Sequence, residues 1–204
     1  MSAVSIRPLA RYDVRAEIGE LRTELERLAG ELEEMRAHAQ TLESLALEDP
    51  LTGLLNRRGF FRDLARALAY RSRYATPAAL LLADLDRFKT INDSYGHEVG
   101  DRALMHLADL LRRNVRASDS VGRLGGDEFA LILWHLDEKT ALQKAASLQA
   151  IVASSPVTVG DVTLALGTSI GVAMLEASET PEDLVARADQ AMYRQKAERK
   201  EGRK

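Results

Sequence analysis

An apolar residue recurs at alternating steps of four and three along the N-terminal part of the chain, and this heptad stripe is the pattern that most constrains the fold. The positions that carry it are Val14, Ile18, Leu21, Leu25, Leu28, Leu32, Met35, Ala39 and Leu42. About four heptads with leucine-rich d positions predict a parallel two-stranded coiled coil, so we expect a homodimer. One amphipathic helix packed on its own domain is the alternative, but a narrow stripe flanked by Glu and Arg favours the coiled coil.

The dipeptide Asp49-Pro50 ends the stripe, because proline lacks an amide donor and disfavours helical angles in the residue before it. We therefore expect a flexible N-terminus over residues 1–13, a dimerising helix over 14–48 and a second domain over 49–204. A domain of roughly 150 residues is long enough to bury one hydrophobic core.

Helical and strand-like patterns alternate through this second domain. Helices are expected over about 56–75, 99–115, 138–153 and 181–196, and strands over about 78–84, on both sides of Gly125-Gly126, and over 164–174. Such alternation with one hairpin predicts an α/β fold, a sandwich of helices on a mixed sheet.

Composition limits the partners of the chain. The formal net charge is -3 and the pI is about 5.9, so no overall basic field favours a nucleic acid polymer or an anionic membrane. The longest apolar run, Ala78 to Ala83, is far below the roughly 20 residues that span a bilayer, so no membrane insertion is expected. The chain has no cysteine, which excludes disulfides and agrees with a cytoplasmic location.

The segment Gly125-Gly126-Asp127-Glu128 places two carboxylates directly after a glycine pair, between two strand-like stretches. Paired glycines allow positive φ in a tight hairpin and let a ligand approach the backbone. Carboxylate oxygens suit Mg²⁺, which nucleotide enzymes share between one or two carboxylates and substrate phosphates. Taken alone, the segment is more typical of a solvated hairpin turn than of a site.

A second segment supports the functional interpretation. Asp84 lies at the end of a buried strand-like run, a common ligand position in α/β folds, where it could share a metal with Asp127. Asn92 and Asp101 offer an amide and a carboxylate that can bond the edge of a guanine base. The alternative is that such residues cap helices or form turns, and His97 favours a structural role.

These motifs together resemble the GGDEF family of diguanylate cyclases. The resemblance covers about residues 49–200 and rests on four segments: 49–58 (DPLTGLLNRR), 84–101 (DLDRFKTIND through GHEVGD), 125–129 (GGDEF) and 188–193 (ADQAMY). Several ordered motifs in agreement are far more specific than any one of them. The resemblance implies a nucleotidyl-cyclase-like α+β sandwich on a mainly antiparallel sheet, and a bacterial enzyme that joins two GTP into cyclic dimeric GMP with release of pyrophosphate.

The resemblance also implies roles for individual residues. The metal site would hold two Mg²⁺, or Mn²⁺, through Asp84, the Leu85 carbonyl, Asp127 and Glu128. Glu128, Asp127 and Lys196 would be catalytic. Substrate would be bound by Phe88, Lys89, Asn92, Asp101, Gly125, Gly126, Lys196 and Lys200. The family usually has arginine four positions beyond Lys196; Lys200 is a point charge there, and Arg203 follows slightly later.

Arg116 and Asp119 match the RxxD product site through which the family is inhibited by cyclic dimeric GMP. The pattern alone favours a surface ion pair, but its position in the family motif favours the product site. No partner arginine is evident around Lys144 and Ser147. The alternatives to a cyclase are a catalytically inactive GGDEF domain that acts as a receptor for GTP or cyclic dimeric GMP, a cyclase making a mixed guanine-adenine dinucleotide, and a coiled-coil scaffold. The intact acidic residues argue against the first, Asp101 against the second, and the ordered motifs against the third.

Overall fold

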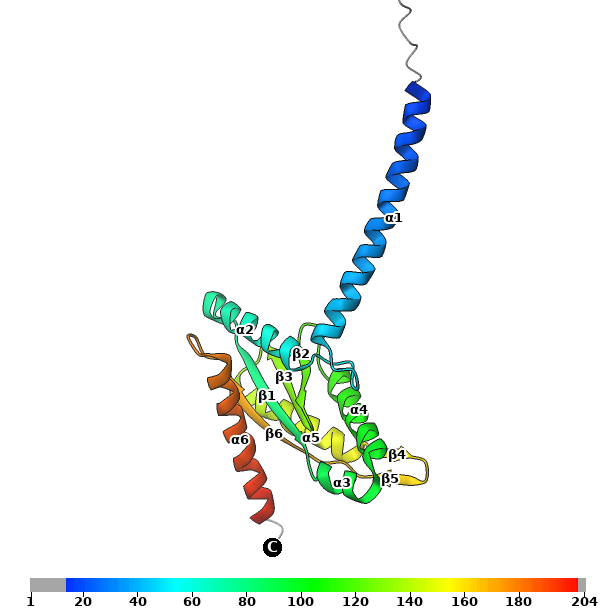
Figure 1. Cartoon of the computed structure of the whole chain (residues 1–204). Helices are drawn as coiled ribbons and strands as arrows, with labels where there is room; N and C mark the ends of the chain where they lie inside the picture. The colour runs from blue at the N-terminus through cyan, green and yellow to red at the C-terminus, as the bar shows by residue number, and fades with distance from the viewer. Residues whose placement is uncertain (1–13, 202–204) are drawn as a thin grey trace, which may run out of the picture. The chain divides into compact units, whose positions relative to one another are not determined.

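The computed structural model describes residues 14–201, without the side chains of residues 14–17, 37, 39–41, 43–45 and 198–201 (Figure 1). The chain divides into two compact units, Met1–Ser44 and Leu45–Lys204, which are considered separately. The expected N-terminal segment 1–13 and Arg203 lie outside the described residues. The helices are α1 (Val14–Leu47), α2 (Arg57–Tyr74), α3 (Phe88–Tyr95), α4 (His97–Arg113), α5 (Glu138–Ser154) and α6 (Pro181–Glu201). The strands are β1 (Ala78–Leu85), β2 (Ser120–Gly125), β3 (Glu128–Trp134), β4 (Val157–Val159), β5 (Val162–Leu164) and β6 (Thr168–Met174).

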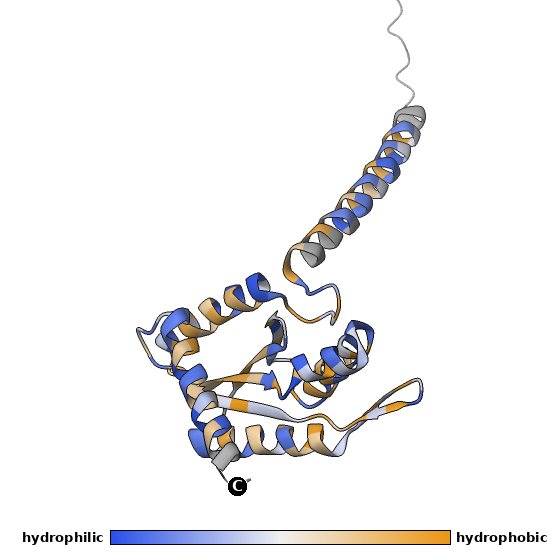
Figure 2. Cartoon of the chain, turned by 60° about the horizontal axis from the view of Figure 1, so that its bottom comes forward, coloured by the Kyte–Doolittle hydropathy of each residue, from blue (hydrophilic) through white to orange (hydrophobic). Residues whose placement is uncertain are grey.

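Helix α1 carries the heptad stripe, and its described stripe side chains are all exposed in the single chain. Their exposed fractions range from 44% for Leu32 to 69% for Leu25. Apolar and polar segments alternate along this helix in Figure 2. On the polar side, Arg27 pairs with Glu24 and Glu31 one turn away in each direction. A long helix is therefore confirmed over this range, and its apolar stripe lacks a covering partner among the described residues.

The central sheet has the strand order β2-β3-β1-β6, and every neighbouring pair is antiparallel. A parallel bridge between Leu55 and Gly122 adds the preceding loop to the edge of β2. The expectation of a mixed, mainly antiparallel sheet is thus confirmed. Register places Asp84 of β1 directly opposite Glu128 of β3 on one side and Ser169 of β6 on the other. Side chains of directly opposed residues point to the same face, so these three share one face of the sheet.

Alternation along the strands builds two cores, one on each face of the sheet. Ala79, Leu81 and Leu85 of β1 face one core, which is completed by buried residues of α4 and α5. Leu80 and Leu82 face the other core, which is completed by α2 and α6. Figure 1 shows the sheet between these two helix pairs. The fold is therefore an α+β sandwich, and Asp84 lies on the α2–α6 face by the same alternation.

Local signals set the limits of α2. The side chain of Asn56 accepts a hydrogen bond from the Gly59 amide and caps the helix, as Asn commonly does at this position. Ala75 takes a left-handed conformation with φ of 55° and ends it. The expected helix over 56–75 differs from α2 only by these two capping residues.

Two regions differ from the sequence expectation. Residues 88–95 form the separate helix α3, and Gly96, with φ of 85°, breaks it from α4, which begins at His97 rather than near residue 99. The expected strand over 164–174 is divided, because β5 ends at Leu164 and pairs with β4 in a hairpin, while β6 begins at Thr168. None of the helices within residues 14–201 combines the length and apolar composition that crossing a membrane requires.

Candidate active site

The end of β1 and the β2–β3 hairpin bring the predicted acidic residues together. Gly125 and Gly126 form the hairpin turn with φ of 147° and 52°, which residues with a side chain rarely adopt. The Leu85 amide donates to the Asp127 carbonyl at 3.2 Å, so the turn is fixed beside the end of β1. Asp84 and Glu128 are paired in register. Four predicted metal-site positions, 84, 85, 127 and 128, therefore converge on one corner of the sheet.

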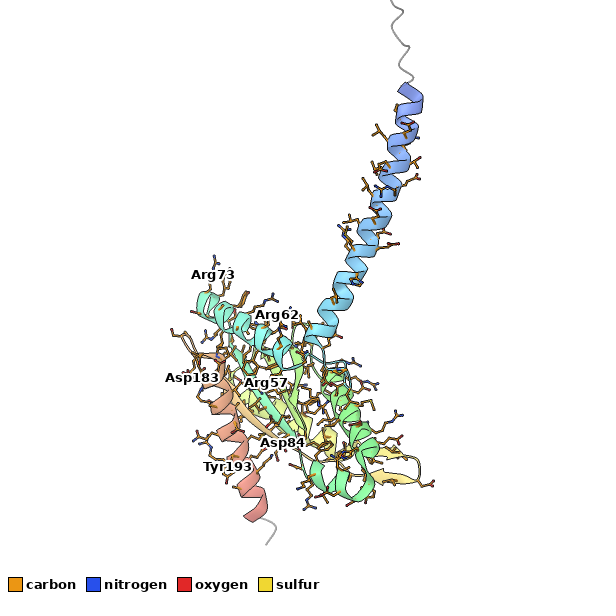
Figure 3. All side chains as sticks on the ribbon, viewed as in Figure 1. Arg57, Arg62, Arg73, Asp84, Asp183 and Tyr193 are labelled. Carbon is orange, nitrogen blue, oxygen red and sulfur yellow. The ribbon has the colours of Figure 1, made fainter. Side chains whose placement is uncertain are left out.

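Asp84 forms an ion pair with a lysine from the far end of the chain. Nζ of Lys196, on α6, lies 2.7 Å from Oδ1 of Asp84, whose side chain is 18% exposed. Figure 3 shows Asp84 at the end of β1, next to α6. Burial raises the pKa of the Asp84 carboxyl; the hydrogen bond and charge of Lys196 oppose this, while the nearby charges of Asp127 and Asp86 add to it. The net direction is upward, which indicates a carboxylate short of compensating positive charge.

Two buried hydroxyl groups of β6 support the same corner, and sequence reasoning missed both. Thr168 Oγ1 donates to the Asp84 carbonyl at 2.9 Å, and Ser169 Oγ donates to Oδ1 of Asp86 at 2.7 Å. Each residue is only 1% exposed. The Asp86 amide donates to the Gly167 carbonyl at 2.8 Å and closes the arrangement. These contacts fix the backbone on which Asp84 and Leu85 lie, so the two hydroxyls are positioning groups. Only the pairing of β6 with β1 reveals them.

Asn92 and Asp101 lie on consecutive helices, α3 and α4. A side chain at Gly100 would collide with Oδ1 of Asn92, so glycine is needed for the close approach of the two helices. That Oδ1 atom is buried and has no hydrogen-bond partner among the described residues. Asp101 is exposed. A buried unsatisfied acceptor costs about 1–3 kcal/mol, so a donor from a ligand is the natural complement to Asn92.

The predicted phosphate-binding residues Phe88 and Lys89 form the first turn of α3. Arg87, with φ of 60°, precedes them without a side-chain cap, so the first amides of α3 are left for another acceptor. Free amides at a helix N-terminus favour anions. Lys196 contributes its ammonium group from α6. The side chain of Lys200 lies outside the described residues, and its predicted phosphate contact stays a prediction.

The donors at the end of β1 fit a hard divalent cation. Within the described part of the chain, no three His, Cys, Asp or Glu side chains form a ready-made metal site. The corner does offer carboxylates and a main-chain carbonyl. Burial there disfavours the negative charge of Asp84, so a bound cation would stabilise it. Mg²⁺ is commonly held by one or two carboxylates together with substrate phosphates. The residues therefore fit a hard divalent cation such as Mg²⁺ that takes its remaining ligands from elsewhere.

The Arg116–Asp119 segment lies at the other end of the hairpin strands. Asp119 accepts hydrogen bonds from the amides of Arg116 at 2.9 Å and Trp134 at 3.1 Å. Each of its two carboxylate oxygens is therefore bonded to a backbone amide. The two residues line a cavity of about 630 Å³ to which Asp63 of α2 and Arg112 of α4 also contribute. Trp134 ends β3, whereas Glu128 begins it. The structure thus separates the predicted product site from the acidic corner by the length of β3.

The family model described as "Diguanylate cyclase, GGDEF domain" matches residues 46–202. The diguanylate cyclase DgcP of Pseudomonas aeruginosa is 35% identical over 181 residues, which cover 87% of this chain and 27% of that protein. DosC of Escherichia coli, also a diguanylate cyclase, is 38% identical over 146 residues, 71% of this chain and 32% of that protein. The chain therefore spans between about a quarter and a third of these two curated relatives.

Solved structures with the same fold were found as well. The coiled coil and GGDEF domain of DgcB from Caulobacter crescentus, in complex with cyclic dimeric GMP, matches with a TM-score of 0.79 and 28% identity, over 87% of this chain and 94% of that one. The diguanylate cyclase SiaD of Pseudomonas aeruginosa, in complex with its activator SiaC, matches with a TM-score of 0.75 and 30% identity, over 91% of this chain and 71% of that one.

Proposed function

Because the chain belongs to the GGDEF family of diguanylate cyclase domains, we propose that it condenses two GTP into 3′,5′-linked cyclic dimeric GMP and two pyrophosphate. The observation that carries the proposal is the convergence of Asp84, Asp127 and Glu128 beside Lys196, together with the unsatisfied acceptor of Asn92. The first group suits a triphosphate, and the second suits a base with donor groups. A cytoplasmic location, where GTP is available, is proposed with it.

We propose a separate binding place for each part of GTP. Asn92 and Asp101 bind the guanine edge: the amide oxygen and the carboxylate accept its ring and amino hydrogens. Phe88 and Lys89 present the first amides of α3 to the phosphates. Gly125 and Gly126 let the nucleotide lie against the hairpin backbone without a Cβ in the way. Lys196 leaves Asp84 and pairs with the triphosphate, and Lys200 adds a second positive charge.

The metal ligands we propose are Asp84, the Leu85 carbonyl, Asp127 and Glu128. They would hold two Mg²⁺ per site, or Mn²⁺, which neutralise phosphate charge when bound. The ion pair with Lys196 partly opposes the rise that burial causes in the pKa of Asp84 before the nucleotide arrives. Thr168 holds the backbone carbonyl of Asp84 during the exchange.

In the reaction, the 3′-hydroxyl of one GTP attacks the α-phosphorus of the other, and pyrophosphate leaves. Glu128, exposed at the start of β3, takes the hydroxyl proton. Phosphoryl transfer depends mainly on positioning and electrostatic stabilisation, and pre-alignment of two reactants is worth up to roughly 7–11 kcal/mol. The same attack then occurs in the opposite direction, and the second phosphodiester bond closes the ring.

One protomer holds one GTP, so the reaction needs two protomers face to face. We propose that α1 supplies this arrangement as a parallel coiled coil. Its apolar stripe from Ile18 to Leu42 is exposed in the single chain, and a second copy with the same heptads is its natural complement. A shared stalk raises the effective concentration of the two catalytic domains to roughly the millimolar range.

Product inhibition is proposed through Arg116 and Asp119. The guanidinium of Arg116 can stack on and bond guanine, and the backbone hydrogen bonds of Asp119 hold its carboxylate in a fixed orientation beside it. The adjoining cavity of about 630 Å³ is large enough for a nucleotide base. Occupancy at this end of β3 would restrain the hairpin that carries Asp127 and Glu128.

The cyclase proposal is tested by incubating the purified chain with GTP and Mg²⁺ and separating the nucleotides by chromatography. Asp127→Ala and Glu128→Ala proteins are run in parallel. We expect cyclic dimeric GMP and pyrophosphate from the parent protein alone. A folded dimer that binds GTP but forms no product would contradict catalysis and favour the receptor alternative.

A further inference from the structure

A cavity of about 460 Å³ lies on the α2–α6 face of the sheet, beside the acidic corner. Its floor is apolar and includes Leu82 of β1, Leu124 of β2 and Met192 of α6. Its walls are the first turns of α2 and the first half of α6. In Figure 3, Arg57 lies at the start of α2 on the side of α6. The volume is within the range of small-molecule sites, roughly 300–1,000 Å³.

Four charged side chains line this cavity: Arg57, Glu128, Glu182 and Asp189, of which Glu128 also belongs to the acidic corner. These four make no hydrogen bond or ion pair within the part of the chain that the structure describes. Neighbouring charges on α6 do form such contacts; Arg187, for example, pairs with Glu176 and Glu179. The charged residues of the cavity therefore retain their full hydrogen-bonding capacity above an apolar floor.

The arrangement selects for a flat base with both donors and acceptors. The Arg57 guanidinium lies over the Phe61 ring, 5.0 Å from its centre, so the ring supports the donor fork in a cation–π contact. Arginine bonds the O6 and N7 acceptors of guanine, and carboxylates accept from its N1–H and N2–H groups. Adenine lacks O6 and N1–H, so it can meet this pattern only in part, through N7 and its amino group. Three carboxylates also disfavour a phosphate inside the cavity.

From these contacts we propose that the α2–α6 cavity is an accessory guanine-binding subsite, in which Arg57, Asp189 and Glu182 bind the base and Phe61 supports the Arg57 guanidinium. This inference rests on the proposed function for one point, that Asn92 and Asp101 bind the guanine of the substrate elsewhere. Glu128 lines the cavity, so an occupant contacts a residue of the reaction itself. High concentrations of a guanine nucleotide therefore slow the enzyme independently of Arg116.

The experiment uses methionine-methyl NMR on the full-length chain. Met192 lies in the cavity floor, whereas Met105 and Met174 line two other cavities and serve as internal references. The background carries Asn92→Ala and Arg116→Ala, which weaken the other two proposed guanine sites. GMP is titrated without divalent metal, and AMP is the comparison. We expect GMP to shift the Met192 methyl signal in a saturable way, with little response to AMP.

Variants then assign the response to the cavity. Arg57→Ala and Asp189→Asn should each weaken GMP binding at least tenfold, while Arg58→Ala, an exposed arginine outside the cavity, should not. Unchanged Met105 and Met174 signals show that the fold is retained. A second titration with cyclic dimeric GMP identifies the source: whichever nucleotide shifts Met192 at the lower concentration is the physiological class.

An unmoved Met192 signal, an equal response to AMP, or unchanged affinity in Arg57→Ala each overturns the subsite. Binding is measured without turnover, so the result is independent of the cyclase assay. If GMP does not bind but product forms normally, only the subsite proposal is refuted. If GMP binds but no product forms from GTP and Mg²⁺, the subsite is supported and the cyclase proposal is refuted.

Discussion

Asp84 and Lys196 form an ion pair of 2.7 Å between the end of β1 and the second half of α6. The contact joins a proposed metal ligand to a proposed phosphate ligand, so in this state each compensates the charge of the other. The compensation is incomplete, because burial still raises the pKa of Asp84 above its ordinary value. The buried charge of Asp84 therefore lowers the stability of the folded domain, and bound substrate and cation would remove this destabilisation.

This cost predicts that Asp84→Asn stabilises the chain while abolishing product formation. A carboxyl whose pKa is raised in the folded state holds a proton that the unfolded chain has already lost, so stability falls as pH rises from 3.8 through the folded pKa. Asparagine resembles the protonated form. At pH 7 with a chelator we expect a melting temperature roughly 1–3 °C higher, and a gain that disappears toward pH 3.8.

Thermal unfolding followed by circular dichroism from pH 3.5 to 8 measures this difference. Asp161→Asn is the control, because Asp161 is an exposed carboxylate in the β4–β5 turn and should leave the melting temperature unchanged. A destabilised Asp84→Asn protein at pH 7 would show that the pair with Lys196 outweighs burial.

The fold was largely readable from local patterns. Asn56 and Pro50 mark the boundary before α2, and the apolar run over 78–83 predicts the buried strand that the structure shows as β1. The β4–β5 hairpin and α3 were missed, because strands of three residues and a helix of eight give too short a period to recognise.

The candidate site was predicted as a set of residues but not as a set of contacts. The glycines and acids of the hairpin were evident from residues 125–128. Nothing local indicates that Lys196 pairs with Asp84, or that Thr168 bonds the carbonyl of the same residue. Such contacts depend on strand order and on the path of α6, which distant parts of the chain determine together.

An ion pair between Asp49 and Arg123, 3.2 Å long, ties the segment before α2 to the hairpin strand β2. Both side chains are largely buried, and Arg123 also donates to the Gly126 carbonyl at 2.8 and 2.9 Å. Burial would raise the pKa of Asp49, but hydrogen bonds from Thr52 and the charge of Arg123 outweigh it and lower the pKa. Asp49 therefore contributes stability above its ordinary pKa of 3.8, and the contribution is lost as pH falls through the lowered value.

A double-mutant cycle with Asp49→Asn and Arg123→Gln measures the pair. We expect a coupling free energy of about 1–3 kcal/mol in urea unfolding at pH 7, and a smaller one near pH 3. Arg123→Gln should also reduce turnover, because the Gly126 carbonyl loses both donors. Additive single effects at pH 7 would mean that the pair is not coupled.

Gly100 permits the contact between α3 and α4 that places Asn92. In Gly100→Ala, the new methyl group collides with Oδ1 of Asn92, so we expect about 1–3 kcal/mol of destabilisation and a raised KM for GTP. Gly30→Ala in α1 is the matched control, since nothing lies within 4 Å of its new methyl group, and it should gain about 1 kcal/mol of helix stability. Equal effects of the two substitutions on KM would contradict the steric explanation.

Arg116→Ala should remove product inhibition without lowering the initial rate, because Arg116 is exposed and its guanidinium forms no hydrogen bond or ion pair with another described residue. The inhibitory concentration of cyclic dimeric GMP should rise at least tenfold in a coupled pyrophosphate assay. Asp119→Ala is a less clean test, since Asp119 also holds the amides of Arg116 and Trp134 and its loss costs about 1–3 kcal/mol. Unaltered inhibition in Arg116→Ala would place the product elsewhere.

The apolar stripe of α1 predicts that activity depends on the coil. In Leu25→Glu with Leu32→Glu, charges replace two leucines of the stripe that are 69% and 44% exposed in the single chain and that a coiled-coil dimer would bury. Burying unpaired carboxylates against their copies costs several kcal/mol, so the variant should sediment as a monomer at micromolar concentration. Thr23→Glu, on the outer side of the helix, adds the same charge without entering the seam and should remain dimeric.

The decisive measurement is the specific activity of the double variant as a function of protein concentration. If the coil acts only by bringing two domains together, the double variant should lose at least tenfold in activity when dilute and recover it as concentration rises toward the effective concentration of the stalk, roughly millimolar. If the coil also sets the orientation of the two active sites, activity stays low even when the domains are concentrated. Full activity of the monomeric variant at low concentration would refute both, because two GTP held on separate protomers must meet before either 3′-hydroxyl can react.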